Sequence, residues 1–407
     1  MSDTVRAQYE AYPYPSRDPA EEKRRLVTGS PSRLDEVNHY LFQGRRDFAR
    51  PFRALVAGGG TGDAAIMLAQ QLADAGDGGR VTYLDLSRQA RSIAAARAEA
   101  RGLTNIDFLT GSLLETAQIA PGPYDYIDCC GVLHHLSEPE AGLRALESVL
   151  AAEGGMGIMV YGTYGRAGVY PLQAMLRQLG EGLPLPERIG QARRLLAALP
   201  RSNAFARNPF LGDHERGDAE LVDLLLHSQD RSYSVPELLE LIAASDLELA
   251  SFIEPARYDP ATYLRDRQLL ARLEDLSRED RAAFAERLAG NIKAHVVYLS
   301  RRQGSVAEPE DAAIPLLVEM EGARLAEALG RELVFKGSFD KLPVAFPLPP
   351  RAPAILRLIG GQRSIAEIRS ALQAQDSRYS DAAFAKDFAA VYRVFNGVNR
   401  LLLRLPV

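Results

Sequence analysis

The sequence predicts an α/β fold built on a doubly wound, mostly parallel sheet, and three observations carry that prediction. Short apolar runs alternate with segments of helical periodicity between residues 53 and 164, as expected for parallel strands joined by crossover helices. The first run, residues 54–57, ends abruptly in a glycine-rich turn, which leads into a helical pattern. The second run ends in an acid, Asp85. Together these features predict a ligand site at the carboxyl ends of the strands.

The predicted sheet has seven strands, which we place from apolar runs bounded by turn residues. Five are expected in the first part of the chain and two more after a helical insertion at residues 165–231: 54–57, 81–84, 106–109, 124–130, 156–161, 247–253 and 294–300. Helices are expected between them, including one capped by Ser234 and Glu237.

The glycine turn carries the most specific chemical signal. Its glycines at Gly58, Gly60 and Gly62 would let a ligand approach the backbone amides and the helix N-terminus, where a side chain would hold it away. The spacing is G-x-G-x-G, whereas the dinucleotide fingerprint requires a glycine where Asp63 stands. Asp85 lies about 20 residues beyond the turn, where an acid accepts hydrogen bonds from ribose hydroxyls in doubly wound folds.

Two later segments complete a family resemblance. Thr110-Gly111-Ser112 follows the third predicted strand, and Gly131-Val132-Leu133-His134-His135-Leu136 follows the fourth. With the glycine turn and Asp85, this order resembles a class I S-adenosylmethionine-dependent methyltransferase of the Rossmann-like type, over roughly residues 53 to 302. The resemblance implies S-adenosylmethionine as cofactor, S-adenosylhomocysteine as its product, and an N or O nucleophile of a small-molecule or peptide/protein acceptor.

The resemblance also implies roles for individual residues. The glycines of the turn would approach the methionine and ribose parts, Asp85 would hold the ribose hydroxyls, and other residues would line the adenine and the sulfonium. The implied cofactor-binding set is Gly58, Gly60, Gly62, Asp63, Asp85, Leu86, Gly111, Ser112, Leu113, Cys130 and Gly131.

One position departs from the family pattern. Many members carry an acid two places before the first glycine, where it helps to bind the amino end of the cofactor, and this chain has Val56 there. Either another group, such as Asp63 or a tyrosine of the N-terminal arm, takes over this role, or cofactor binding is weakened.

The candidate catalytic residues are His134, Tyr14 and His214. His134 follows the fourth strand beside the expected methyl site, and histidine titrates near neutral pH; the alternative is a structural role in the loop. Residues 1–50 form an arm in which Tyr9 to Pro15 is expected to be extended and Leu34 to Phe48 helical. This arm either closes over the cofactor or packs its tyrosines outside the sheet.

Composition narrows the function classes. The net charge of −5 argues against broad nucleic-acid binding, and no window approaches the ~18 apolar residues of a membrane span. The two cysteines are adjacent, which fits a reducing cytoplasm. The six histidines are dispersed along the sequence without a metal-ligand spacing, so metal catalysis is not indicated.

Residues 312–407 are expected to form a small α+β domain after a polar linker, with a domain of residues 51–302 before it. This C-terminal domain is read as a dimerisation or packing domain, or as a peptide-recognition module. Together with Val56 it motivates an alternative function, a cofactor-binding regulatory or scaffold protein without turnover. A third alternative, an NAD-dependent oxidoreductase, is disfavoured by Asp63 in the turn.

Overall fold

The structure is a computed structural model that describes residues 3–406. The chain forms two compact units. The first comprises the chain up to Arg33, Phe48–Glu248 and Gly290–Val296, and the second comprises Leu34–Asp47, Leu249–Ala289 and the chain from Val297 onward. The expected C-terminal domain, residues 312–407, lies within the second unit.

A seven-stranded sheet has the order β3-β2-β1-β4-β5-β7-β6, which confirms the predicted fold class. Its strands are β1 (Phe52–Ala57), β2 (Gly79–Asp85), β3 (Ile106–Thr110), β4 (Tyr124–Cys130), β5 (Leu150–Tyr161), β6 (Glu248–Phe252) and β7 (Ala294–Ser300). Strands β1 to β5 pair in parallel. Chain order reverses between β1 and β4, which is the switch point where doubly wound folds bind ligands.

The helices that join these strands are α3 (Asp63–Ala75), α4 (Arg88–Arg101), α5 (Thr116–Ile119), α6 (Pro139–Glu147) and α10 (Val235–Ile242). The α4 helix begins at Ser87, whose hydroxyl accepts a hydrogen bond from the Ala90 amide. Strand β1 is buried along almost its whole length, as expected for a parallel sheet covered on both faces. The core therefore lies between the sheet and these helices.

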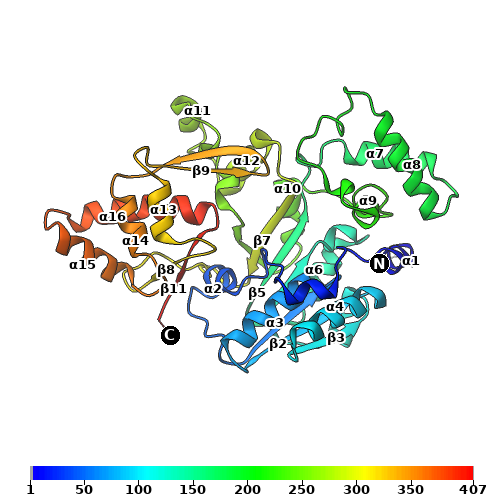
Figure 1. Cartoon of the computed structure of the whole chain (residues 1–407), viewed down its shortest axis with the longest axis horizontal. Helices are drawn as coiled ribbons and strands as arrows, with labels where there is room; N and C mark the ends of the chain where they lie inside the picture. Colours follow the sequence, from blue (N-terminus) through cyan, green and yellow to red (C-terminus); the bar gives the residue numbers. More distant parts are fainter. Residues whose placement is uncertain (1–2, 407) are drawn as a thin grey trace. The chain divides into compact units, whose positions relative to one another are not determined.

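The insertion consists of α7 (Val169–Leu179), α8 (Leu185–Ala198) and α9 (Asp218–Leu225). Figure 1 shows the three helices, in green, gathered into one lobe. They share an apolar cluster that includes Leu172, Leu176 and Leu221, and Tyr12 of the N-terminal arm packs against it. The arm and the insertion thus meet in the first unit.

The N-terminal arm differs from its expected conformation. Helix α1 runs Asp3–Ala11, so Tyr9 is helical rather than extended, and the Tyr12 amide still donates to the Gln8 carbonyl. Proline restricts the residue just before it, so Pro13 constrains Tyr12 and leaves the earlier residues free to form a helix. A short 3-10 helix, η1 (Pro19–Lys23), follows.

Helix α2 (Leu34–Leu41) is also shorter than the expected helix, which was to reach Phe48. Gln43 and Gly44 have φ values of 54° and 73°. This left-handed conformation ends the helix.

The second unit contains helices α2, α11 (Arg267–Arg272), α12 (Arg278–Ala289), α13 (Gly322–Ala328), α14 (Ala352–Leu358), α15 (Ile365–Gln375) and α16 (Asp381–Gly397). Two small antiparallel sheets accompany them, one of β8 (Ile314–Leu317) and β11 (Leu401–Arg404), the other of β9 (Val334–Phe339) and β10 (Leu342–Pro347). Among the described residues, no helix has the length and apolar character needed to span a membrane.

Candidate functional site

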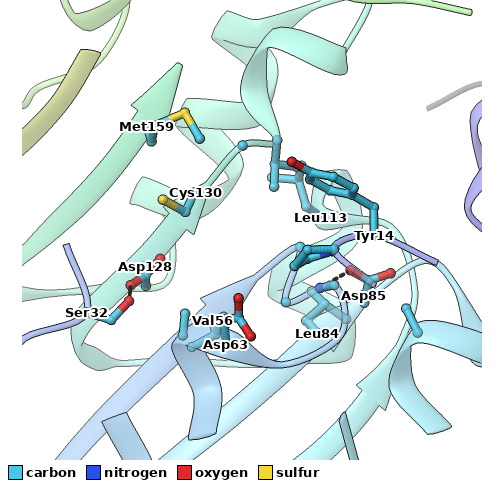
Figure 2. A pocket seen from close by; sticks show the side chains of 18 of the residues that line it. Tyr14, Ser32, Val56, Asp63, Leu84, Asp85, Leu113, Asp128, Cys130 and Met159 are labelled. Atoms are coloured by element: carbon cyan, nitrogen blue, oxygen red, sulfur yellow. Dashed lines mark hydrogen bonds between the residues drawn. The ribbon is translucent and has the colours of Figure 1, made fainter. Parts of the chain in front are cut away.

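A cavity of about 370 Å³ opens at the carboxyl ends of β1, β2 and β4, and all of its lining residues belong to the first unit. Its walls come from the glycine turn, the ends of the three strands, the N-terminal arm and the insertion. Figure 2 shows the side chains around it. The volume falls within the range of small-molecule pockets.

The glycine turn is held in a conformation that requires glycine. Gly58 and Gly60 line the cavity with φ values of 77° and 52°. A Cβ on Gly58 would meet the Val132 side chain at 2.3 Å, and one on Gly60 would meet the Tyr14 carbonyl oxygen at 2.8 Å. Gly62 does not line the cavity: a Cβ there would lie 2.8 Å from the Ala94 side chain of α4, so this glycine allows the two helices to pack closely.

Asp85 ends β2 and lies at the cavity wall, where it fixes the loops around it. Its Oδ2 accepts a hydrogen bond from the Gly60 amide and its Oδ1 one from the Ser87 amide, both at 2.8 Å (Figure 2). Burial raises the pKa of this carboxyl above its usual value. Each oxygen keeps a further lone pair, so the carboxylate can also accept hydrogen bonds from a ligand diol.

The loop after β3 forms a neighbouring wall. Gly111, Ser112 and Leu113 line the cavity, as does Leu86 after β2. The Ser112 hydroxyl accepts a hydrogen bond from the Leu114 amide at 3.2 Å and so caps the following 3-10 turn. This wall therefore offers mainly apolar and backbone surface, which suits a flat aromatic ring.

Cys130, Gly131 and Met159 line the cavity at the ends of β4 and β5. Burial raises the pKa of the Cys130 thiol well above its usual value, so the sulfur stays a neutral thiol. A neutral thiol and a thioether give this wall a polarizable, weakly polar surface.

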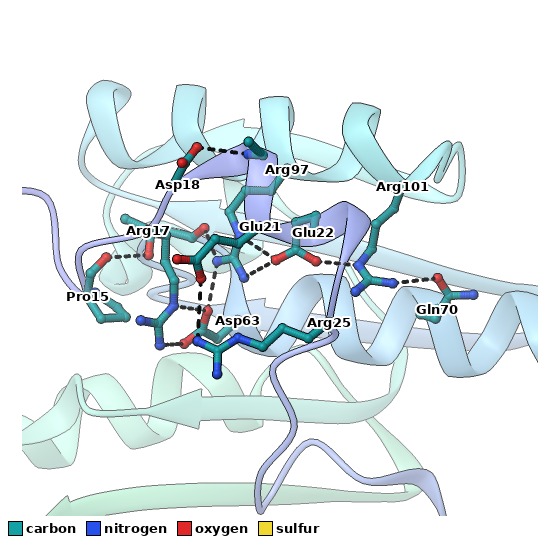
Figure 3. Close-up of polar contacts among 12 residues, drawn as sticks. Pro15, Arg17, Asp18, Glu21, Glu22, Arg25, Asp63, Gln70, Arg97 and Arg101 are labelled. Carbon is teal, nitrogen blue, oxygen red and sulfur yellow. Dashed lines mark hydrogen bonds and ion pairs between the residues drawn. The ribbon is translucent and has the colours of Figure 1, made fainter.

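Asp63 occupies a different environment from the one expected of a cofactor ligand. It touches the cavity, but its Oδ2 accepts from Arg17 Nη2 at 2.6 Å and its Oδ1 from Arg17 Nε and Arg97 Nη1, each at 2.8 Å. Although burial raises the pKa of this carboxyl, the two guanidinium groups bring it below its usual value. Figure 3 shows that this network also holds Glu22, so Asp63 fastens the arm to α3 and α4.

Asp128 is a cavity residue that we did not anticipate from the sequence. It lies on β4, fully buried, and its Oδ2 accepts from the Ser32 hydroxyl at 2.6 Å (Figure 2). Its Oδ1 has no hydrogen-bond partner within the described chain, and burial raises the pKa of the carboxyl to about 7. The signal available in the sequence was its position two residues before Cys130, which puts both side chains on the same face of the strand.

A cluster of polar side chains forms another part of the cavity wall. Asp223 of α9 accepts hydrogen bonds from the Tyr9 hydroxyl at 3.1 Å and from the Tyr161 hydroxyl at 2.8 Å. The Tyr9 oxygen also lies 3.2 Å from Nε2 of His227. Tyr9, Tyr161 and Asp223 all line the cavity, and we refer to them with His135 and His227 as the tyrosine–aspartate cluster.

The two adjacent histidines after β4 have different surroundings. His134 is fully buried, stacks on Tyr161 with ring centroids 3.8 Å apart, and does not line the cavity. Neither of its ring nitrogens has a hydrogen-bond partner within the described chain. His135 does line the cavity, and its Nδ1 lies 3.0 Å from the Gln229 carbonyl oxygen. This contact requires a proton on Nδ1, which leaves Nε2 as an acceptor.

The fold brings together histidines that are far apart in the sequence. His135 and His227 stack with ring centroids 3.9 Å apart, and the potential ligand atoms of these two rings and Asp223 lie within 4.8 Å of one another. However, Nδ1 of His227 accepts the Gln229 amide at 3.0 Å, so the proton of the neutral ring is on Nε2. A protonated nitrogen is no metal ligand, and the arrangement favours a chain of hydrogen bonds from His227 through Tyr9 to Asp223.

Of the other two candidate catalytic residues, one lines the cavity and the other does not. Tyr14 lines the cavity, and burial raises the pKa of its hydroxyl. His214 lies in a short 3-10 helix (Asp213–Glu215), outside the cavity lining, with its ring edge against Phe205 at 5.1 Å between centroids.

Comparisons with known proteins agree with this geometry. Residues 55–156 match the model of a methyltransferase domain family. An uncharacterized protein of Synechococcus sp. is 30% identical over 314 residues, which cover 74% of this chain and 72% of that protein. This chain therefore belongs to the same family as that protein.

Solved structures show the same fold. The structure of PKMT2 from Rickettsia typhi matches with a TM-score of 0.63 at 13% identity, over 93% of this chain and 77% of that one. The structure of the same protein in complex with AdoHcy matches with a TM-score of 0.62 at 12% identity, over 94% and 76%. The matched domain, the seven-stranded sheet and the glycine turn lead to one conclusion: the chain belongs to the class I methyltransferase superfamily, whose cofactor is S-adenosylmethionine.

Proposed function

We propose that this protein is an enzyme that transfers the methyl group of S-adenosylmethionine to an N or O nucleophile of a small-molecule or peptide/protein acceptor. One observation carries the proposal: a single cavity joins the glycine turn and Asp85 to the tyrosine–aspartate cluster. The first two features suit a nucleoside-containing cofactor. The third provides hydrogen-bonding groups for a second molecule.

For the cofactor, Asp85 accepts the ribose hydroxyls, and Leu86 and Gly111 to Leu113 enclose the adenine. The turn at Gly58 to Gly60 lets the amino acid part approach the backbone, and the polarizable side chain of Cys130 borders the sulfonium. Bound S-adenosylmethionine supplies an activated methyl group, so the protein contributes mainly alignment.

For the acceptor, the tyrosine–aspartate cluster contributes both hydrogen-bond acceptors and donors. Asp223 is held by two tyrosine hydroxyls, and Nε2 of His135 is left as an acceptor. These groups orient a nucleophile that carries hydrogen, such as an amine or a hydroxyl. The enclosed ring of His134 supports the cluster through its stacking on Tyr161, which makes His135 a better candidate than His134 for contact with the acceptor.

A second candidate function is a cofactor-binding regulatory or scaffold protein without turnover. Burial lowers the pKa of His135 to about 4 and that of His227 to about 3. A general base works best with a pKa near the working pH, so neither ring is tuned as one. This observation favours acceptors that need no strong base, or no turnover at all.

Methyl transfer is tested with S-adenosylmethionine labelled in its methyl group, incubated with amines, phenols, peptides and a bacterial extract. The proposal predicts label in one acceptor class together with S-adenosylhomocysteine, and loss of both in an Asp85→Ala variant. Cofactor binding without any product across these acceptors would favour the scaffold function instead.

The free, adjacent Cys129 and Cys130 agree with a reducing compartment, and we place the reaction in the cytoplasm.

A further inference from the structure

S-adenosylmethionine carries an α-ammonium group, and the position where the family pattern has an acid for it is Val56 in this chain. An ammonium group taken out of water needs a hydrogen-bonding anion as partner. Four carboxyl groups of the described chain line the cavity, those of Asp63, Asp85, Asp128 and Asp223. The question is which of them is available.

Three of the four carboxyl groups are already engaged through both oxygens. Asp63 binds two arginines. Asp85 accepts two backbone amides, and its remaining lone pairs are assigned to the ribose hydroxyls. Asp223 accepts two tyrosine hydroxyls. Asp128 is different because its Oδ2 accepts the Ser32 hydroxyl while its buried Oδ1 has no partner in the part of the chain that the structure describes. A buried polar atom without a partner calls for an explanation, and in the wall of a cavity a bound ligand can supply that partner.

The strand register explains why Asp128 is suitably placed. Strands β1 and β4 are parallel neighbours, and Val56 is paired with Asp128. Paired residues of adjacent strands point to the same face of a sheet, about 5 Å apart. Both line the cavity, and Figure 2 shows Asp128 together with Ser32 on the β4 side, and Asp85 away from them. The missing acid is therefore replaced by one on the neighbouring strand at the same level.

We propose that Asp128, oriented by Ser32, accepts the α-ammonium group of S-adenosylmethionine in place of an acid at Val56; this inference rests on the cofactor assignment of the proposed function. The ribose and the ammonium group are then held by acids on opposite sides of the glycine turn, Asp85 on β2 and Asp128 on β4. Such an arrangement matches an extended ligand with a diol at one end and a cation at the other. Burial raises the pKa of Asp128, and a bound cation would lower it again.

The test compares two ligands that differ in the amino acid part. S-adenosylhomocysteine carries the ammonium group, and 5′-methylthioadenosine lacks the amino acid end altogether. Calorimetric titration of each is carried out with the wild type, Asp128→Asn, and the control Asp125→Asn, which removes a charge from the same strand outside the cavity lining. We expect Asp128→Asn to weaken the binding of S-adenosylhomocysteine roughly tenfold or more. The affinity for 5′-methylthioadenosine, and both affinities of the control, should change less than about threefold.

If Asp128→Asn lost the same affinity for both ligands, the inference would be overturned, because the replacement would then have a general structural effect. Unchanged affinity for both ligands would also overturn it. If that variant does not fold, the wild type is titrated with the analogue of S-adenosylhomocysteine in which hydrogen replaces the α-amino group. Equal affinity for this analogue would then overturn the inference, and roughly tenfold weaker binding would support it. Failure of the wild type to bind either ligand would instead contradict the proposed function itself.

Discussion

The replacement Asp128→Asn leads to a prediction about stability that is opposite in sign to its effect on cofactor binding. In the folded, ligand-free protein, burial raises the pKa of Asp128 from its usual 3.8 to about 7. Between these values the folded state binds more protons than the unfolded state, so stability falls as the pH rises through this window. The Ser32 hydroxyl donates a hydrogen bond to the carboxyl, and the carboxyl interacts electrostatically with the thiols of Cys129 and Cys130, which burial keeps neutral.

The size of the effect follows from the pKa difference. About three pKa units correspond to about 4 kcal/mol at 1.36 kcal/mol each, as an upper estimate. Asparagine has nearly the same shape and no charge, so Asp128→Asn removes this penalty. At pH 8 the variant should be more stable than the wild type by up to about 4 kcal/mol, or roughly 5 °C in melting temperature for a chain of this length. At pH 4 the two proteins should differ little.

The assay is thermal unfolding of both proteins, followed by circular dichroism from pH 4 to pH 8. Comparing the two proteins at each pH cancels the contributions of other titrating groups. A variant that is less stable than the wild type by the same amount at every pH would refute the reasoning, because it would show that the folded protein accommodates the charge of Asp128 without penalty.

Three other predictions address the site and its supports. Asp85→Ala should weaken S-adenosylhomocysteine at least tenfold in a calorimetric titration, since the ribose hydroxyls lose their acceptor; unchanged affinity would show that the ribose lies elsewhere. Arg97→Met removes the guanidinium that binds Oε1 of the buried Glu22 carboxylate at 2.6 Å and leaves Arg101 on Oε2, so it should lower the free energy of unfolding by roughly 1–3 kcal/mol and speed proteolysis of the arm. The control Arg80→Met breaks an exposed ion pair and should change stability by less than about 1 kcal/mol; equal losses in the two variants would contradict the role of Arg97 in holding the arm. Removal of residues 303–407 should leave an aggregating fragment, because buried groups of α2 lose hydrogen-bond partners near the C-terminus; a soluble fragment with full cofactor binding would show that this region is a separable domain.

The features that were predictable from the sequence are those encoded by short, local patterns. The glycine turn, the acid at the end of β2 and the apolar strands each depend on residues close together in the chain. These patterns were sufficient for the fold class and for the family. They also placed Gly58, Gly60 and Asp85 at the wall of the cavity.

The remaining features depend on contacts between distant segments. Tyr9 meets Asp223 and His227 across separations of 214 and 218 residues, and nothing in the local sequence of either segment marks this meeting. Asp63 follows the glycines directly, as a ligand residue would, yet Arg17 binds it from 46 positions away. The relation between Val56 and Asp128 is a matter of strand register, which the spacing of residues along one strand does not reveal.

The same limit applied to secondary structure. Strands β8, β9 and β10 were not anticipated, because proline in β8 and β10 and glycine in β9 weaken the strand pattern. Each is stabilised by pairing with another segment. Helix α1 was not predicted, because the prolines that follow it suggested an extended arm. These prolines restrict Tyr12 and Tyr14 but not the residues from Asp3 to Ala11.

The central claim, that the cavity beside the glycine turn holds S-adenosylmethionine, is tested most directly by calorimetric titration of ligand-free protein with S-adenosylmethionine and S-adenosylhomocysteine. We predict one site per chain with micromolar affinity for both, lost in Asp85→Ala. Folded, ligand-free protein that binds neither compound would contradict the account.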